Sequence, residues 1–282
     1  NPAFAFMEKH HYRVKTVKLQ RQISQGLVFP VFDILPISIL YQVGTDVTKL
    51  LGITKYEPPI RMAAEDQEKD YPLFIKYTDI ENFRNFPNII KPNEEVYVAE
   101  KIHGTNIRIG LIEDVVMIGS HNYNRKRPED ISKHKYWQVL NIYPQIEELL
   151  KSIKSDFKQV ILFGELYGKG IQTLQYGTTA PDFAAFDLFI DGKYIDYQEF
   201  VYYCNKYGLP NVPILDKVPF SFDLIKNTAS GTSILGGEHI KEGVVVRPIK
   251  EQWNEKIGRL ILKYVNDDYL AGNYFESEIK EQ

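Results

Sequence analysis

A short apolar run that ends in lysine, histidine and glycine constrains the fold of this chain more than any other segment. The stretch 96–110, VYVAEKIHGTNIRIG, predicts two strands, 96–102 and 107–112, joined by a turn. Lys101 stands at the end of the first strand, and Gly104 lies in the turn. Because glycine lets a backbone approach a ligand closely, this arrangement can hold a lysine amine against a phosphate. The pattern is also compatible with the ordinary end of a strand. The other segments of the sequence have to distinguish a phosphate-binding lysine from such a strand end.

Strand patterns recur along the rest of the chain, with two helical segments between them. The predicted strands are 96–102, 107–112, 115–119, 159–166, 183–190, 243–248 and 259–265. Residues 136–153 carry apolar side chains at helical spacing, and 196–208 form a second helical pattern that Gly208 ends. This order of elements predicts an α+β domain over 75–282, with antiparallel sheets and flanking helices.

The segments before this domain have a different character. Residues 1–40 contain strand-like runs and are predicted to be the end of a small β domain. Residues 41–74 are predicted to be a linker with short helices. Within them, 43–59 has a helical pattern stopped by a glycine and a Pro-Pro turn, and 62–72 is charged and lacks β-branched residues. The first residue is Asn1 rather than Met, so we expect the chain to begin partway into a longer protein.

The charge of the chain is nearly balanced but unevenly distributed. Over 282 residues the net charge is −3, which argues against a uniformly basic nucleic-acid-binding protein. Basic residues nevertheless cluster at 9–21 and at 125–135. Two such clusters suit an enzyme that contacts a polyanion on one face, and they are equally compatible with two solvated surfaces.

Cysteine content and hydrophobicity bear on the compartment in which the chain works. A single cysteine, Cys204, rules out an internal disulfide framework and fits a reducing environment. We therefore expect an intracellular protein, in the cytoplasm. Because the sequence contains no run of 18 uncharged apolar residues, we expect no membrane partner.

Charged residues stand singly beside three further strands. Glu165 ends the run ILFGE, Glu242 precedes GVVVRP, and Lys263 interrupts RLILKYV. A lone charge inside a β-run is costly unless it is paired or faces a cleft. Each of the three is separately compatible with the exposed face of a strand. Together with Lys101, they predict one cleft that binds phosphates and a metal ion.

In chain order, these motifs resemble those of the covalent nucleotidyltransferases, the superfamily of polynucleotide ligases and capping enzymes. The motifs are Lys101-x-His-Gly-x-Asn, Phe-Gly-Glu165, Ala-Phe186-Asp, Glu242-Gly-x-Val and Lys263. The histidine in the first motif, in place of the usual aspartate, resembles the RNA ligase 2 family in particular. This resemblance covers roughly residues 75–270. Upstream, YRVKTVKLQRQISQGLVFP and LLGITKYEPP resemble the branch of RNA ligases with an N-terminal OB-type domain, of which 1–40 would be the end.

The resemblance implies an ATP-dependent RNA ligase that uses Mg²⁺ or Mn²⁺. In this family a lysine takes AMP from ATP, the AMP moves to a 5′-phosphate on RNA or DNA, and an RNA 3′-OH then displaces it. The implied nucleophile is Lys101. The implied nucleotide contacts are Glu100, Lys101, Asn106, Glu165, Phe186, Glu242 and Lys263, and the implied metal contacts, through water, are Glu165 and Glu242. The implied substrate is a nicked duplex of RNA or an RNA/DNA hybrid, sealed by a monomer in RNA repair.

The last family motif is incomplete in this sequence. The family often has two lysines separated by one residue, whereas Val265 stands two positions after Lys263. Arg247 and Lys169 are therefore alternative phosphate contacts.

The turn and the segment after the nucleophile also carry specific expectations. An arginine is expected near position 121, where this chain has His121, and we assign contact with the RNA end to Arg125. His103 has no second histidine at a metal-ligand spacing, so it is predicted to orient the turn through hydrogen bonds.

Two other hypotheses about the function of this chain stay open at this point. One has the same chemistry, a DNA ligase or a guanylyltransferase of the capping type, although His103 argues against both. The other is a non-catalytic nucleic-acid-binding module that grips a backbone through its basic clusters. That reading leaves the two lysines and two glutamates of the predicted cleft as coincidence.

Overall fold

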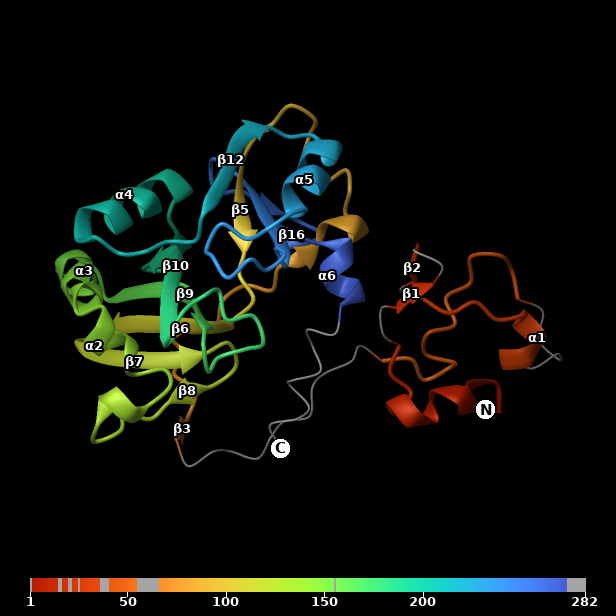
Figure 1. Cartoon of the computed structure of the whole chain (residues 1–282), viewed down its shortest axis with the longest axis horizontal. Coiled ribbons are helices and arrows are strands. Elements are labelled where there is room, and N and C mark those ends of the chain that lie inside the picture. Colours follow the sequence, from red (N-terminus) through yellow and green to blue (C-terminus); the bar gives the residue numbers. More distant parts are fainter. Residues whose placement is uncertain are drawn as a thin grey trace. The chain divides into compact units, whose positions relative to one another are not determined.

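The structure is a computed structural model, and it describes residues 2–14, 17–19, 22–24, 26–35, 41–54, 66–154 and 156–272 (Figure 1). The chain divides into two compact units, Asn1–Met62 and Ala63–Gln282. Within the described ranges, no helix combines the length and the apolar character needed to cross a membrane.

The first unit is built from short elements. A 3-10 helix, η1 (Pro2–His10), precedes an antiparallel strand pair, β1 (Val17–Leu19) and β2 (Gln22–Ser24), and helix α1 (Val31–Ile34) follows. That this unit contains the end of an OB-type domain stays a prediction. Lys15 and Arg21 of the basic cluster at 9–21 lie outside the described residues.

Residues 41–54 form turns where the sequence predicted the first part of a helix over 43–59. Gly44 and Gly52 have φ angles of 90° and 65°. Because a right-handed helix requires negative φ at every residue, the chain turns at both glycines. Positions 55–59 lie outside the described residues.

Two sheets form the framework of the second unit (Figure 1). The first contains β3 (Gln67–Glu68), β6 (Thr105–Ile112), β7 (Val115–Ser120), β8 (Asn124–Arg125), β9 (Gln159–Gly168), β10 (Pro181–Ile190) and β11 (Lys193–Tyr194). The second contains β4 (Glu81–Asn82), β5 (Glu95–Lys101), β12 (Ile214–Pro219), β13 (Gly243–Pro248) and β16 (Leu262–Val265). Their strand orders are β11-β10-β9-β6-β7-β8-β3 and β12-β5-β13-β16-β4.

Most strand pairs in these sheets are antiparallel, and the described exception is β16 with β4. The remaining elements are η2 (Phe83–Asn85), η3 (Ile131–Lys133), α2 (Val139–Ile142), α3 (Gln145–Lys154), α4 (Tyr197–Tyr207), α5 (Phe222–Ala229), the hairpin of β14 (Trp253–Asn254) with β15 (Gly258–Arg259), and α6 (Asp267–Ala271). The predicted α+β fold, antiparallel sheets with flanking helices, is therefore confirmed.

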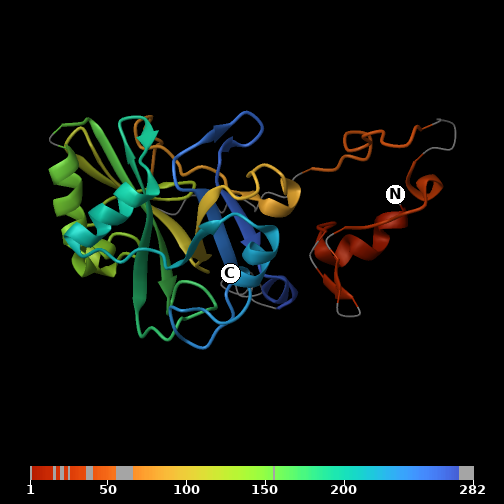
Figure 2. The ribbon, with the colours of Figure 1, turned by 90° about the horizontal axis from the view of Figure 1, so that it is seen from above.

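Helices cover the outer faces of both sheets, as the view from above shows (Figure 2). α3 and α4 pack on the seven-stranded sheet through fully buried side chains, among them Ile146, Leu149, Leu150, Phe200 and Cys204. α5 packs on the five-stranded sheet through Ile225 and Ala229. The predicted helix over 136–153 is broken at Pro144, which has no backbone N–H and stands just before α3.

Three segments differ in detail from the sequence prediction. Part of the predicted linker 62–72 is a strand, because β3 pairs with β8 at the sheet edge. The predicted strand 259–265 is interrupted because Leu260 N–H still donates to Gln252 O in the hairpin of β14 and β15, and the chain joins the five-stranded sheet only from Leu262. The sequence patterns also missed β12, which has no buried residue, and α5, which buries Ile225 and Ala229.

The chain crosses from one sheet to the other in the turn between β5 and β6. A Cβ at Gly104 would lie 2.2 Å from Leu166 O and 2.7 Å from Glu165 Cγ. No L side chain fits that space, so glycine is required for β6 to lie against β9 directly after β5 ends. The turn therefore brings Lys101 close to Glu165.

Candidate active site

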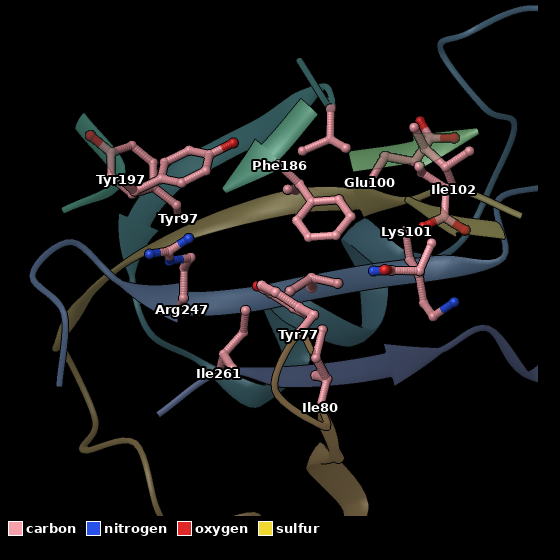
Figure 3. A pocket seen from close by; sticks show the side chains of 15 residues that line it. Tyr77, Ile80, Tyr97, Glu100, Lys101, Ile102, Phe186, Tyr197, Arg247 and Ile261 are labelled. Carbon is pink, nitrogen blue, oxygen red and sulfur yellow. The ribbon is translucent and has the colours of Figure 1, made fainter. Parts of the chain in front are cut away.

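A cavity of about 130 Å³ lies between the two sheets of the second unit (Figure 3). Strands β5 and β13 line it from one sheet, and β6, β9 and β10 line it from the other. Six predicted site residues contribute to its lining: Glu100, Lys101, Asn106, Glu165, Phe186 and Arg247. The tertiary fold thus collects residues from positions 100 to 247 in one place.

Lys101 and Glu242 form an ion pair at one end of this cavity. Lys101 lies opposite Gly243 in the β5–β13 register, and its Nζ donates a hydrogen bond to Glu242 Oε1. Burial alone would lower the pKa of the Lys101 amine, but the charges of Glu242 and Glu165 outweigh burial and raise the pKa above its ordinary value. Without a ligand, Lys101 is therefore a protonated ammonium and not a nucleophile.

Glu165 is the second carboxylate beside the amine. It lies opposite Asn106 in the β6–β9 register. Burial raises the pKa of Glu165 to about 8; Lys101 opposes this shift and Glu242 adds to it. Two carboxylates thus share one cation, and Glu165 is largely protonated near neutral pH.

Two buried polar atoms in the cavity lack a partner among the described residues: Asn106 Oδ1 and Glu100 Oε1. The other carboxylate oxygen of Glu100 accepts a hydrogen bond from Ile234 N–H at 3.1 Å, which fixes the side chain. Buried acceptors without a donor are destabilising unless a ligand satisfies them. Glu100 and Asn106 are therefore arranged to accept hydrogen bonds from a molecule in the cavity.

Phe186 enters the cavity because of a β-bulge. In the β9–β10 register, Ala185 lies opposite Gly164 and Asp187 opposite Phe163, so Phe186 is the extra, unpaired residue. A bulge bends the strand and redirects a side chain. The Phe186 ring meets the Tyr77 ring at 4.8 Å in an edge-to-face contact, and Figure 3 shows it in the middle of the cavity.

Arg247 occupies a different position from the one predicted for a phosphate contact. Figure 3 shows it at the end of the cavity away from Lys101. Its guanidinium pairs with buried Asp187 at 3.2 Å and also with Glu251, and it lies over the Tyr197 ring. Its charge is thus already neutralised.

Lys263 lies on β16 opposite Val245, a residue that lines the cavity, although Lys263 itself is not among the lining residues. Burial and the positive charge of Lys101 lower the pKa of Lys263, while Glu242 opposes this shift. The repulsion between the two lysines indicates that an anion would be attracted to the space they share. Lys169, the other alternative, is exposed in the turn after β9.

His103 is held in the turn by residues from distant segments. Its backbone N–H donates to Tyr176 OH at 2.7 Å, and its ring nitrogens meet Thr173 Oγ1 at 2.9 Å and Tyr269 OH at 2.6 Å. Burial, together with the charges of Lys101 and His239, lowers the pKa of His103 to about 4. A neutral imidazole with both nitrogens engaged orients the turn, in the manner expected from the sequence.

Arg125 lies outside the cavity. Its NH1 pairs with Asp66 at 3.1 Å, and its guanidinium lies over the Tyr136 ring. His121, at the position where an arginine was expected, lies 3.6 Å from Asp79.

A buried ion-pair network below the cavity was missed by the sequence analysis. Asp187 pairs with Arg247 from β13 and with Arg259 from β15 at 2.6 Å, and it accepts a hydrogen bond from Tyr77 OH. Arg259 also pairs with Glu251 at 2.7 Å. The network joins β10 to the other sheet directly beside Phe186. The sequence feature that could have indicated this network is the presence of one aspartate and two arginines, Asp187, Arg247 and Arg259, within apolar runs.

The residues around Lys101 fit a divalent metal ion only in part. Hard cations prefer oxygen ligands, and Glu165 and Glu242 supply carboxylates. Among the described residues, no group of three or more histidine, cysteine, aspartate or glutamate side chains could hold a metal ion. Two carboxylates suit Mg²⁺ or Mn²⁺ that completes its shell with water and phosphate oxygens.

Two sheets around a cavity that holds a lysine between carboxylates, with an aromatic ring beside it, define this protein as a nucleotidyltransferase. The RNA ligase family model matches residues 94–265, and the chain belongs to that family.

Solved structures agree with this assignment. Naegleria gruberi RNA ligase with PPi is 26% identical with a TM-score of 0.70, covering 96% of this chain and 77% of that one. A mutant of the same ligase with ATP and Mn is 26% identical with a TM-score of 0.72, covering 92% and 76%. An apo mutant is 28% identical with a TM-score of 0.71, covering 92% and 75%. A search of curated proteins finds no match.

Proposed function

We propose that this protein is an ATP-dependent RNA ligase that works through a covalent lysyl-AMP intermediate on Lys101. The observation that carries the proposal is the position of the Lys101 amine, at the end of a cavity lined by an aromatic ring and unsatisfied acceptors. Naegleria gruberi RNA ligase has been solved with PPi, with ATP and Mn, and with AMP and Mn, which are the molecules and the metal that this reaction involves.

The cavity supports one orientation of ATP. The adenine base lies against Phe186, and Val245 lines the cavity with it. Glu100 Oε1 accepts from the exocyclic amine of adenine, whereas the carbonyl of guanine at that position would face a carboxylate. The α-phosphate then lies at the Lys101 end, with Lys263 beside it. In this orientation of ATP, the residue that contacts the α-phosphate is Lys263 and not Arg247 or Lys169.

In the first step, the neutral Lys101 amine attacks the α-phosphorus of ATP. A P–N bond forms, the bond from the α-phosphorus to the bridging oxygen breaks, and pyrophosphate leaves. The amine must first lose a proton, because its pKa is raised in the free protein. When bound, a divalent cation held by Glu165 and Glu242 would offset the carboxylate charges that hold this proton and would stabilise charge on the phosphates.

In the next two steps the AMP is passed on and released. An oxygen of a 5′-phosphate attacks the same phosphorus, the P–N bond breaks, and Lys101 regains a proton. A 3′-OH then attacks the 5′-phosphate, a phosphodiester forms and AMP leaves. We assign the 3′-OH to RNA and the substrate to a nicked duplex of RNA or an RNA/DNA hybrid, in RNA repair.

The domain assignment is part of the same proposal. Residues 75–282 form the nucleotidyltransferase domain, 1–40 the end of an OB-type domain, and 41–74 the link between them. Contact of the OB-type domain with duplex nucleic acid fits a nick-sealing enzyme, and an intracellular monomer is sufficient for this chemistry.

The decisive test is incubation with ATP labelled at the α-phosphate, with Mg²⁺ or Mn²⁺, followed by denaturing electrophoresis and peptide mass spectrometry. We expect the label and one AMP on Lys101, and no label on Lys101→Ala. Lys193→Ala, in an exposed position on β11, is the matched control and should label normally. GTP in place of ATP separates a ligase from a capping-type guanylyltransferase, and nicks with a DNA 3′-OH separate an RNA ligase from a DNA ligase. Absence of any adduct from folded, unadenylylated protein would favour the non-catalytic binding module.

A further inference from the structure

The loop between β8 and α2 concentrates positive charge. Five cations lie between positions 125 and 135, namely Arg125, Lys126, Arg127, Lys133 and Lys135, against two carboxylates, Glu129 and Asp130. This stretch is basic although the chain as a whole has a net charge of −3. We call residues 126–135 the basic loop; it lies beside β8 in Figure 1.

Two cations of this loop face solvent without a neutralising carboxylate. Lys126 and Arg127 are exposed, and within the described part of the chain no carboxylate lies at ion-pair distance from either. Lys133 pairs with Asp130 at 3.2 Å, but both side chains are half exposed or more. Such a surface pair is easily replaced by a stronger anion.

Aromatic residues beneath the loop hold its arginines in place. The guanidinium of Arg127 lies 5.2 Å from the centre of the buried Trp137 ring. The Trp137 indole N–H donates to Arg125 O at 3.2 Å, which ties the loop to β8. A guanidinium already held against an aromatic ring loses less conformational freedom when it binds a phosphate.

The loop is also connected to the candidate active site. Tyr136 OH and Thr105 Oγ1 are 3.2 Å apart, and Thr105 is the first residue of β6 after the turn that follows Lys101. The next residue, Asn106, lines the cavity. The residue that directly follows the basic loop therefore contacts the strand that leads into the cavity.

We infer that the basic loop binds the sugar–phosphate backbone of the RNA strand whose 5′ end enters the cavity, through Lys126, Arg127 and Lys133. This inference rests on the proposed function and adds its RNA-binding surface. Arg125 belongs to the support of the loop, because Asp66 and Tyr136 hold its guanidinium from below.

The test compares two triple variants. Lys126→Ala/Arg127→Ala/Lys133→Ala removes the surface, and Lys193→Ala/Lys206→Ala/Lys226→Ala removes three exposed lysines elsewhere; Lys206 lies over the Tyr207 ring and matches the Arg127–Trp137 contact. Each protein is titrated with a 5′-phosphorylated nicked RNA duplex over a range of NaCl concentrations. Adenylylation by ATP is measured separately, without RNA.

We expect the basic-loop variant to bind RNA at least tenfold more weakly at low salt and to lose about three units of the slope of log K against log salt, about one for each cation removed. Its adenylylation should equal that of the wild type, which also shows that the variant is folded. Equal affinity and equal slope in the two triple variants would overturn the inference. A wild type that binds RNA but is never adenylylated would instead overturn the proposed ligase chemistry and leave the surface intact.

Discussion

Lys101 and Glu242 are joined by an ion pair across neighbouring strands, although 141 positions separate them in the chain. The register of β5 with β13 places Gly243 opposite Lys101, and Glu242 reaches the amine from the end of its strand. The pair keeps the amine protonated in the free protein. The ion pair with Glu242 must therefore be weakened before the Lys101 amine can lose its proton and act as a nucleophile.

The first prediction concerns this control. Glu242→Gln removes the charge that raises the pKa of Lys101, so the free amine should titrate at lower pH than in the wild type, as measured by NMR of the ¹³C-methylated lysine. Because the variant also loses a metal-binding carboxylate, adenylylation should slow by about 10- to 100-fold. Glu147→Gln, which removes an exposed partner of Lys151, should change neither.

The second prediction is a pH dependence of stability that arises from Glu165. Its folded-state pKa of about 8 lies above the value of an unfolded glutamate, so folding is progressively less favoured as pH rises through this window. The Glu165→Gln variant has an amide at this position, which does not ionise. We expect the variant to have a higher melting temperature than the wild type at pH 8, with the difference disappearing near pH 4. A difference that stays constant across this range would contradict a raised pKa at Glu165.

The third prediction tests the bulge that aims Phe186 into the cavity. Phe186→Ala should weaken ATP binding by roughly 10- to 100-fold, because base–aromatic stacking is worth about 1–3 kcal/mol. Phe186→Tyr keeps the ring and should bind ATP within a few-fold of the wild type. Calorimetric titration with ATP on Lys101→Ala protein, which cannot form the adduct, measures both. If the alanine and tyrosine variants bound ATP with equal affinity, Phe186 would not stack on the adenine base.

The fourth prediction concerns the buried network around Asp187. Burial would raise the pKa of Asp187, but Arg247 and Arg259 outweigh burial and hold it below the ordinary value. Asp187→Asn leaves two buried arginines with less compensation and should lower the free energy of unfolding by about 3–5 kcal/mol in urea titrations. Lys151→Ala breaks an exposed pair and should change it by less than about 0.5 kcal/mol.

The fifth prediction separates positioning from proton transfer at His103. Tyr269→Phe removes the hydrogen bond to its ring, worth about 1 kcal/mol, and should slow adenylylation several-fold with little change in the KM for ATP. Because the pKa of His103 is about 4, the rate should show no inflection from this residue between pH 5 and pH 9. An inflection near pH 6 that is lost in His103→Asn would instead indicate acid–base catalysis.

Local signals in the sequence were sufficient for most of the longer strands, the two larger helices and the order of the motifs. The alternation of apolar residues, the glycines and the prolines act over a few positions, so 96–102 and 183–190 could be recognised without knowing their neighbours. The same holds for Lys101 at the end of its strand.

Only the tertiary structure decided what these residues face. Phe186 points into the cavity because one extra residue in β10 breaks its register with β9, and nothing in DFAAFDLF marks that bulge. Arg247 has the same charge in the sequence as Lys263, yet Asp187 and Glu251 neutralise it at the far end of the cavity. Burial and ion pairing depend on segments that are far apart along the chain, and those contacts exist only when the two sheets come together around Lys101.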